Sequence, residues 1–219
     1  MDRTFDAVIL AGGRSSRLSG TPKALLRLEG KSLLLRTLEA VRRAQRIAVV
    51  GPGELAGELA TFRRGAGAPE AVLTREDPPF AGPAAGIAAG VAALDQGSGK
   101  EHDGGRPRGA RLTLILACDM PAAGRLPEQL LDAVAAAPSV RLWLPVDAGG
   151  RVQPLACCAD SRALREALAR FTTADLQGLS VRKLIADLPT ARFPLAAAAT
   201  DDVDTWEDAG RFGIARPAP

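Results

Sequence analysis

A chain of 219 residues that is 47 % hydrophobic but only 4 % aromatic has room for one large α/β domain or two small ones, with an aliphatic core. Its formal net charge of +3 is small, and no basic stripe is interleaved with aromatics, which gives no support for a nucleic-acid partner. No stretch of about 18 apolar residues occurs, and no apolar signal segment follows the first residues. We therefore expect a cytoplasmic protein without a membrane partner.

Short apolar runs alternate with helical patterns, which predicts a largely parallel sheet covered by helices on both faces. Strands are expected at residues 5–10, 47–50, 71–73, 112–117, 140–146 and 153–158. Helices are expected at residues 31–43, 54–62, 82–94, 127–137, 161–171, 180–188 and 204–212, the fifth with its cap region at Ser161. One domain is expected over residues 1–219, with a mobile loop at 96–110 and a frayed tail at 215–219.

The first expected strand ends in a corner that suits a polyanion. Gly12 and Gly13 let backbone N–H groups approach a ligand closely, and Arg14, Arg17 and Lys23 add three cations within eleven residues. The corner lacks the G-x-G-x-x-G spacing of a dinucleotide fold and the G-K-[ST] ending of a P-loop. A nucleoside triphosphate is the polyanion that we expect at this donor-rich turn.

Acidic residues follow other expected strands. Asp119 ends the most apolar strand, where its carboxylate suits Mg²⁺ beside triphosphate oxygens; a turn cap is the alternative. Asp77 lies in a proline-rich loop. Asp204 and Thr205 either begin the last helix, or one of the carboxylates of Asp201, Asp202 and Asp204 completes a metal site. Because ligands of such sheets bind at the carboxyl ends of the strands, we expect Gly12, Asp77, Asp119 and the turn at 147–151 along one rim.

The histidine and cysteine content restricts the reaction types that the chain could catalyse. The chain has one histidine, His102, in the expected mobile loop, so catalysis through a histidine base has no support. Positioning and charge neutralisation, as in nucleotidyl transfer, are favoured instead. Cys118, Cys157 and Cys158 form no C-x-x-C pair and lie in apolar runs, so we expect buried structural thiols rather than a metal or redox site.

Several short motifs occur together in one order along the chain. They are Leu10-Ala11-Gly12-Gly13-x-Ser15-x-Arg17, Lys23-Ala24-Leu25-Leu26, Gly30-Lys31-Ser32-Leu33-Leu34, Gly82-Pro83-x-x-Gly86-Ile87, Cys118-Asp119-x-Pro121, Gln153-Pro154-Leu155 and Asp204-Thr205-x-Glu207-Asp208. With this set, the chain resembles the small nucleotidyltransferases related to molybdenum cofactor guanylyltransferase from about residue 5 to 212. The resemblance implies a Rossmann-like three-layer sandwich and an enzyme that uses GTP and Mg²⁺. It would transfer GMP to the molybdenum-carrying molybdopterin and release pyrophosphate.

The resemblance also implies residue roles and partners. The nucleotide-binding residues would be Leu10, Ala11, Gly12, Gly13, Lys23, Asp77 and Asp119. Lys23 would contact the phosphates, Asp119 would bind Mg²⁺ with Asp204 as a further candidate ligand, and the three catalytic residues would be Arg17, Lys23 and Asp119. The place of Arg17 in the corner suits it to steady the charge on the leaving pyrophosphate. Molybdenum-insertion proteins or molybdoenzyme chaperones are the protein partners that this reaction suggests.

Two other interpretations stay open. A related enzyme would keep the fold and change the base or the acceptor, by cytidylyl transfer to molybdopterin or by nucleotidyl transfer to a sugar phosphate or phospholactate. A non-catalytic module that binds a nucleotide or cofactor is the second interpretation, and Ser19 and Pro22, which depart from the family pattern, are the features that point to it. The presence of Arg17, Lys23 and Asp119 together favours the enzyme.

Overall fold

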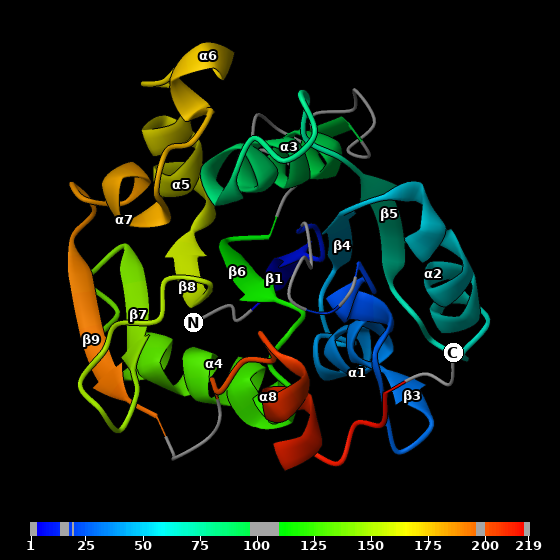
Figure 1. Cartoon of the computed structure of the whole chain (residues 1–219). Coiled ribbons are helices and arrows are strands. Elements are labelled where there is room, and N and C mark those ends of the chain that lie inside the picture. Colours follow the sequence, from blue (N-terminus) through cyan, green and yellow to red (C-terminus); the bar gives the residue numbers. More distant parts are fainter. Residues whose placement is uncertain (1–3, 14–17, 19, 97–109, 196–199, 217–219) are drawn as a thin grey trace.

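The computed structural model describes residues 4–13, 18, 20–96, 110–195 and 200–216. A seven-stranded sheet lies between two layers of helices, in the strand order β5-β4-β1-β6-β8-β7-β9 (Figure 1). Its strands are β1 (Phe5–Leu10), β4 (Arg46–Val50), β5 (Glu70–Thr74), β6 (Leu112–Ala117), β7 (Leu142–Val146), β8 (Ala156–Asp160) and β9 (Thr190–Pro194). A separate hairpin pairs β2 (Arg27–Leu28) with β3 (Lys31–Ser32).

The sheet is predominantly parallel, as predicted. β8 runs antiparallel to both β6 and β7, and the other neighbouring strands pair in parallel. Six of the seven strands therefore end at the same edge, which collects the loops that follow β1, β4, β5, β6, β7 and β9. The strand expected at 153–158 begins later, at Ala156, because Gln153 belongs to the turn that joins β7 to β8.

The helices form two layers. They are α1 (Leu33–Ala40), α2 (Ala56–Arg63), α3 (Pro83–Gln96), α4 (Leu126–Ala136), α5 (Ser161–Leu168), α6 (Thr173–Leu176), α7 (Val181–Leu184) and α8 (Trp206–Arg211), with the 3₁₀ turns η2 (Lys23–Leu25), η3 (Gly53–Leu55) and η4 (Ala123–Arg125). α1, α2 and α4 pack on one face of the sheet, while α3, α5, α6 and α7 cover the other (Figure 1). None of the helices in the described part of the chain has the length and apolar character needed to cross a bilayer.

Two local expectations were wrong. Asp160, not Ser161, caps α5, because the Asp160 carboxylate accepts a hydrogen bond from Ala163 N at 3.0 Å. The Ser161 hydroxyl instead bonds Thr113 Oγ1 on the neighbouring strand at 2.8 Å. The helix expected at 180–188 is the single turn α7, which Ser180 caps through Lys183 N. Most of the loop expected at 96–110 and the end of the expected tail lie outside the described residues.

The core is built from aliphatic side chains and close backbone contacts. A Cβ on Gly90 of α3 would lie 2.5 Å from Val8 Cγ1, so the helix lies directly on β1. Cys118, Cys157 and Cys158 are free and buried, which confirms the expectation of structural thiols. Burial raises the pKa of Cys157 to about 12, which keeps this thiol protonated at neutral pH.

Candidate functional site

Lys23 and Asp119 meet at the carboxyl edge of the sheet. Lys23 begins η2, and Asp119 directly follows β6. Lys23 Nζ donates a hydrogen bond to Asp119 Oδ2 at 3.0 Å and a second one to Asp204 Oδ1. The three side chains come from distant parts of the sequence, so the fold itself assembles this charged group.

The surroundings of Lys23 keep its side chain charged. Burial by itself would lower the pKa of the ammonium group, but the negative charge of Asp119 and the hydrogen bonds to both carboxylates outweigh burial, so the Lys23 pKa is raised. The side chains of Lys23 and Asp119 are each 22 % exposed, so the pair is only partly screened by water. Lys23 therefore offers a permanent positive charge that a phosphate could bind.

A third carboxylate joins the group. Oxygens of Asp119, Asp202 and Asp204 all lie within 4.8 Å of one another. Burial, followed by the charges of Asp204 and Asp119, raises the pKa of Asp202. Three hard oxygen donors at this spacing fit the preference of Mg²⁺ and similar divalent cations. The residues present could therefore hold such an ion.

The segment before α8 aims two of these carboxylates at the same point. Val203 N donates to Asp119 O at 3.0 Å, and the Val203 side chain is fully buried in a small cluster with Leu18 and Leu26. Carboxylate oxygens of Asp202 and Asp204, the residues on either side of Val203, both lie close to that of Asp119. Asp202 and Asp204 therefore face Asp119 while Val203 anchors the segment from behind.

The cap of α8 is Thr205, not Asp204. Asp208 N donates to Thr205 Oγ1 at 3.1 Å, and Asp208 Oδ2 accepts from Thr205 N at 2.8 Å, which makes a complete capping box. Asp204 N also donates to Asp208 Oδ2 at 3.2 Å. The Asp204 side chain is therefore not used to cap α8 and pairs with Lys23 instead. Asp204 belongs to the charged cluster rather than to the start of the helix.

The glycine corner lies beside this cluster. Cys118 N donates to Leu10 O at 3.1 Å, which ties the start of the corner to the residue before Asp119. Ala11 is buried, while Gly12 and Gly13 are exposed, and Gly13 has a φ of +151° that other residues rarely adopt. Of the predicted site residues, Arg17 alone lies outside the described part of the chain.

The loop after β5 brings a residue that the sequence did not single out. Asp77 is exposed and makes no hydrogen bond or ion pair with the described residues of the Lys23 cluster. Its neighbour Glu76 points inward, with Oε1 4.0 Å from the position that a Cβ would take on Gly12. Glu76 and Asp77 are adjacent carboxylates that the sequence does not distinguish, and the path of the loop determines which of them points toward the glycine corner.

The turn after β7 is closed by its own side chain. Asp147 Oδ1 accepts from Gly149 N and Arg151 N, each at 2.9 Å, and Oδ2 accepts from Gln153 Nε2 at 2.7 Å. The backbone bond from Arg151, the largest cause, and the bonds from Gln153 and Gly149 lower the pKa of Asp147. The turn lies at the carboxyl edge as expected, but its carboxylate is already used within the turn.

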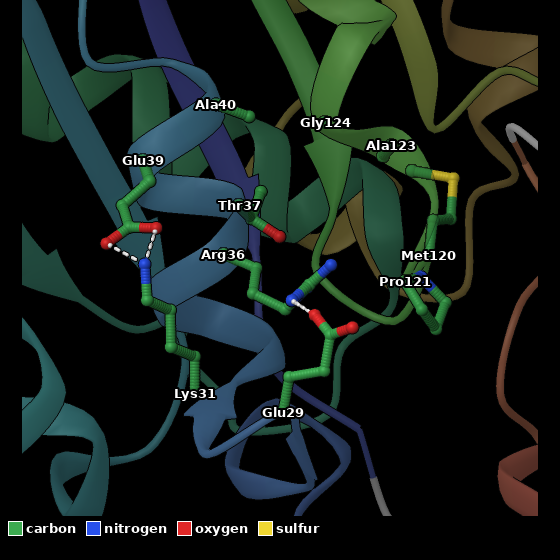
Figure 2. A pocket seen from close by; sticks show the side chains of 10 residues that line it. All are labelled: Glu29, Lys31, Arg36, Thr37, Glu39, Ala40, Met120, Pro121, Ala123 and Gly124. Atoms are coloured by element: carbon green, nitrogen blue, oxygen red, sulfur yellow. Dashed lines mark hydrogen bonds and ion pairs between the residues drawn. The ribbon is translucent and has the colours of Figure 1, made fainter. Parts of the chain in front are cut away.

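A cavity of about 400 Å³ lies between α1 and the segment that follows Asp119, and Figure 2 shows the side chains that line it. Its lining residues are Glu29, Lys31, Arg36, Thr37, Glu39, Ala40, Met120, Pro121, Ala123 and Gly124. Lys31 pairs with Glu39, and Arg36 pairs with Glu29 at 3.1 Å, so its charged side chains neutralise one another. The cavity adjoins the segment that follows Asp119 but does not include the cluster.

A family model described as the MobA-like NTP transferase domain matches residues 7–192. The chain belongs to this family. A molybdenum cofactor guanylyltransferase from Cupriavidus metallidurans is 30 % identical over 169 residues, which are 74 % of this chain and 72 % of that protein. Another, from a Shewanella species, is 29 % identical over 175 residues, 80 % of this chain and 77 % of that protein.

A solved structure of molybdopterin-guanine dinucleotide biosynthesis protein A from Archaeoglobus fulgidus shares the fold. It aligns with a TM-score of 0.63 at 21 % identity and covers 94 % of this chain and 96 % of that chain. The predicted three-layer α/β sandwich is thus confirmed, as is the resemblance to the small nucleotidyltransferases. As a member of the MobA-like NTP transferase family, the chain is a nucleotidyltransferase.

Proposed function

We propose that this nucleotidyltransferase transfers GMP from GTP to molybdenum-molybdopterin in a Mg²⁺-dependent reaction. The observation that carries the proposal is the convergence of Lys23, Asp119, Asp202 and Asp204 beside the glycine corner. A cation-binding group next to exposed backbone donors suits a metal-bound triphosphate. The names of the two relatives, both molybdenum cofactor guanylyltransferases, support GTP as donor and molybdopterin as acceptor.

The chain's own residues divide the work of binding and charge neutralisation. Backbone groups of Leu10, Ala11, Gly12 and Gly13 would cradle the nucleotide, with Asp77 beside the nucleoside. Lys23 would leave its carboxylate partners and bind phosphate oxygens. Arg17, from its place in the corner, would steady the leaving pyrophosphate.

Asp119, with Asp202 and Asp204, would hold Mg²⁺. The ion, when bound, would neutralise charge on the triphosphate and polarise its α-phosphate. Before GTP binds, Asp119 and Asp204 would hold the Lys23 ammonium at the place where the phosphates later bind.

The bond changes need no strong base. A phosphate oxygen of molybdopterin attacks the α-phosphorus of GTP, and the bond to the β-phosphate breaks as the new anhydride bond forms. Pyrophosphate leaves with the electron pair. A phosphate monoester is already largely ionised at neutral pH, so positioning and charge neutralisation suffice. The lack of a histidine in the described site fits this chemistry.

The test is product identification. The purified chain would be incubated with Mg²⁺ and molybdenum-loaded molybdopterin in four parallel reactions, each with one nucleotide: GTP, CTP, ATP or UTP. The mass of the pterin product would then be measured by mass spectrometry. We expect a GMP adduct and pyrophosphate with GTP. A CMP adduct would instead assign cytidylyl transfer. If none of the four nucleotides released pyrophosphate, molybdopterin would be ruled out as the acceptor.

A further inference from the structure

The carboxyl ends of β1, β4 and β5 are joined side by side by backbone hydrogen bonds. Ala11 N donates to Val50 O at 2.8 Å, and Gly51 N donates to Thr74 O at 2.9 Å. A side chain at Gly51 has no room, because its Cβ would lie 2.7 Å from Leu55 Cδ1 and 3.1 Å from Ala11 O. The loop that follows β5 therefore lies next to the glycine corner, with no side chain from Gly51 between them.

Glu76 directs its carboxylate from that loop toward the corner. Its Oε1 would lie 4.0 Å from a Cβ on Gly12. The same oxygen accepts a hydrogen bond from Phe80 N at 2.9 Å, which holds the Glu76 side chain in this direction. Oε2 makes no hydrogen bond within the part of the chain that the structure describes, so it is available to a ligand.

The Phe80 ring lies where a large apolar side chain is unusual. It is 48 % exposed, and its backbone has a φ of +65°, a region that bulky residues rarely adopt. The Arg75 guanidinium lies 5.2 Å from the centre of the ring. Strained backbone and exposed aromatic surface concentrate at binding sites. The loop therefore combines the exposed aromatic ring of Phe80 with the oriented carboxylate of Glu76.

A carboxylate that can use both of its oxygens distinguishes guanine from the other bases. Guanine presents N1–H and N2–H₂ as two adjacent donors, and an ionised carboxylate only accepts hydrogen bonds. Adenine and cytosine place a ring acceptor beside their amino group, which would face the carboxylate unfavourably. Uracil flanks its single N–H donor with two carbonyl oxygens. The carboxylate of Glu76 therefore matches one base of the four.

We propose that Glu76 is a specificity-determining residue that selects guanine by accepting hydrogen bonds from its N1–H and N2–H₂ groups. The inference rests on the proposed function, because it takes the corner at residues 10–13 as the nucleotide site. Phe80 fixes the Glu76 side chain through its backbone N–H. Selection by Glu76 would decide which nucleotide enters, and the phosphate-binding cluster would act on whichever nucleotide is bound.

The test compares nucleotide affinities of the full chain and Glu76→Gln by calorimetric titration with GTP, ITP and ATP in the presence of Mg²⁺. The glutamine carbonyl can still accept from Phe80 N, so the loop is preserved, but its amide donor would oppose a guanine donor. GTP affinity should fall by about tenfold or more, while ATP affinity stays the same. ITP lacks the 2-amino group, so it should bind the wild type more weakly than GTP and lose less in the variant.

Glu70→Gln is the matched control, because Glu70 is an exposed carboxylate at the opposite end of β5. This variant should keep the wild-type preference. An unchanged GTP-to-ATP preference in Glu76→Gln, or equal binding of GTP and ITP by the wild type, would overturn the inference while leaving nucleotidyl transfer intact. Conversely, selective GTP binding through Glu76 without any transfer to molybdopterin would support the inference and refute the proposed function.

Discussion

At the scale of single residues, the site consists of the Lys23 ammonium group held between carboxylates. Lys23 bonds Asp119 and Asp204, and Asp202 lies within reach of the same point. Three acidic groups this close would repel one another if the ammonium group were absent. Lys23 thus holds the cluster together in the ligand-free chain and presents the charge that phosphates would bind.

Lys23→Met tests both roles, because methionine keeps an unbranched apolar stem but removes the charge. Without Mg²⁺, the free energy of unfolding should fall by about 1–2 kcal/mol, since partly buried carboxylates lose their partner. Millimolar Mg²⁺ should restore part of this loss by binding the freed carboxylates. Urea unfolding with and without Mg²⁺, followed by GTP titration, measures these effects. Unchanged stability together with unchanged GTP affinity would show that Lys23 has neither role.

Among the elements, the short helix α8 determines where the acidic segment lies. Its capping box fixes Thr205 and Asp208, and Ala209 and Ile214 pack in the same small cluster as Leu18 and Leu26. The sequence motif around Thr205 was part of the family resemblance, but its two aspartates, Asp204 and Asp208, make different contacts. Asp208 holds the helix start and Asp204 faces Lys23.

The cap makes the stability of α8 depend on pH. The Thr205 side chain, the largest stabilising cause, and the Arg211 side chain lower the pKa of Asp208 to about 2, from an ordinary value of about 3.9. Since the folded pKa is depressed, the stabilisation is complete above about pH 4 and is lost as the pH falls through 2. The difference in urea midpoint between wild type and Asp208→Asn should therefore shrink from pH 6 to pH 2. A constant difference over that range would contradict this assignment.

The helix α3 owes its close approach to the sheet to small residues. Gly90→Ala would place a Cβ 2.5 Å from Val8 Cγ1, and the required shift should destabilise the chain by about 1–3 kcal/mol. Gly57→Ala is the matched control, because a Cβ at this position of α2 meets nothing within 4 Å. That substitution should stabilise the helix by about 0.5–1 kcal/mol. Thermal or urea unfolding of the two variants checks the contrast, and equal effects would refute the close packing.

On the scale of the whole molecule, the sequence predicted the strands and helices with strong apolar patterns. It did not predict β9, because Pro189 directly precedes this edge strand and Pro194 is its last residue, and prolines are atypical of strands. It also missed α6, a four-residue helix too short to show a helical period.

The sequence also predicted those site residues that lie in recognisable motifs, but not those whose position depends on a loop. Lys23 and Asp119 lie in recognisable motifs. The direction of Glu76, and which carboxylates of residues 201–204 approach Asp119, depend on loop paths that residue types do not encode.

One sheet contains strands from both halves of the chain, so we propose that residues 1–219 unfold as one domain. β5 and β9 form its two edges, and β1 lies between β4 and β6. The tryptophans lie in separate places, with Trp143 in β7 and Trp206 in α8. Urea curves from far-ultraviolet circular dichroism and from variants that retain one tryptophan each should coincide. Two separated transitions would instead indicate independent units.

The central claim is that the carboxylate after β6 and the lysine of η2 act on one metal-bound triphosphate. The most direct measurement is the rate of GMP transfer from labelled GTP by wild type, Asp119→Asn and Asp187→Asn. Asp187 is the control, because its ion pair with Arg170 is exposed and lies outside the cluster of Lys23, Asp119, Asp202 and Asp204. Asp119→Asn should lower the rate about a thousandfold, since a neutral amide replaces an anionic metal ligand, and Asp187→Asn should match wild type. Transfer at the wild-type rate by Asp119→Asn would contradict the account.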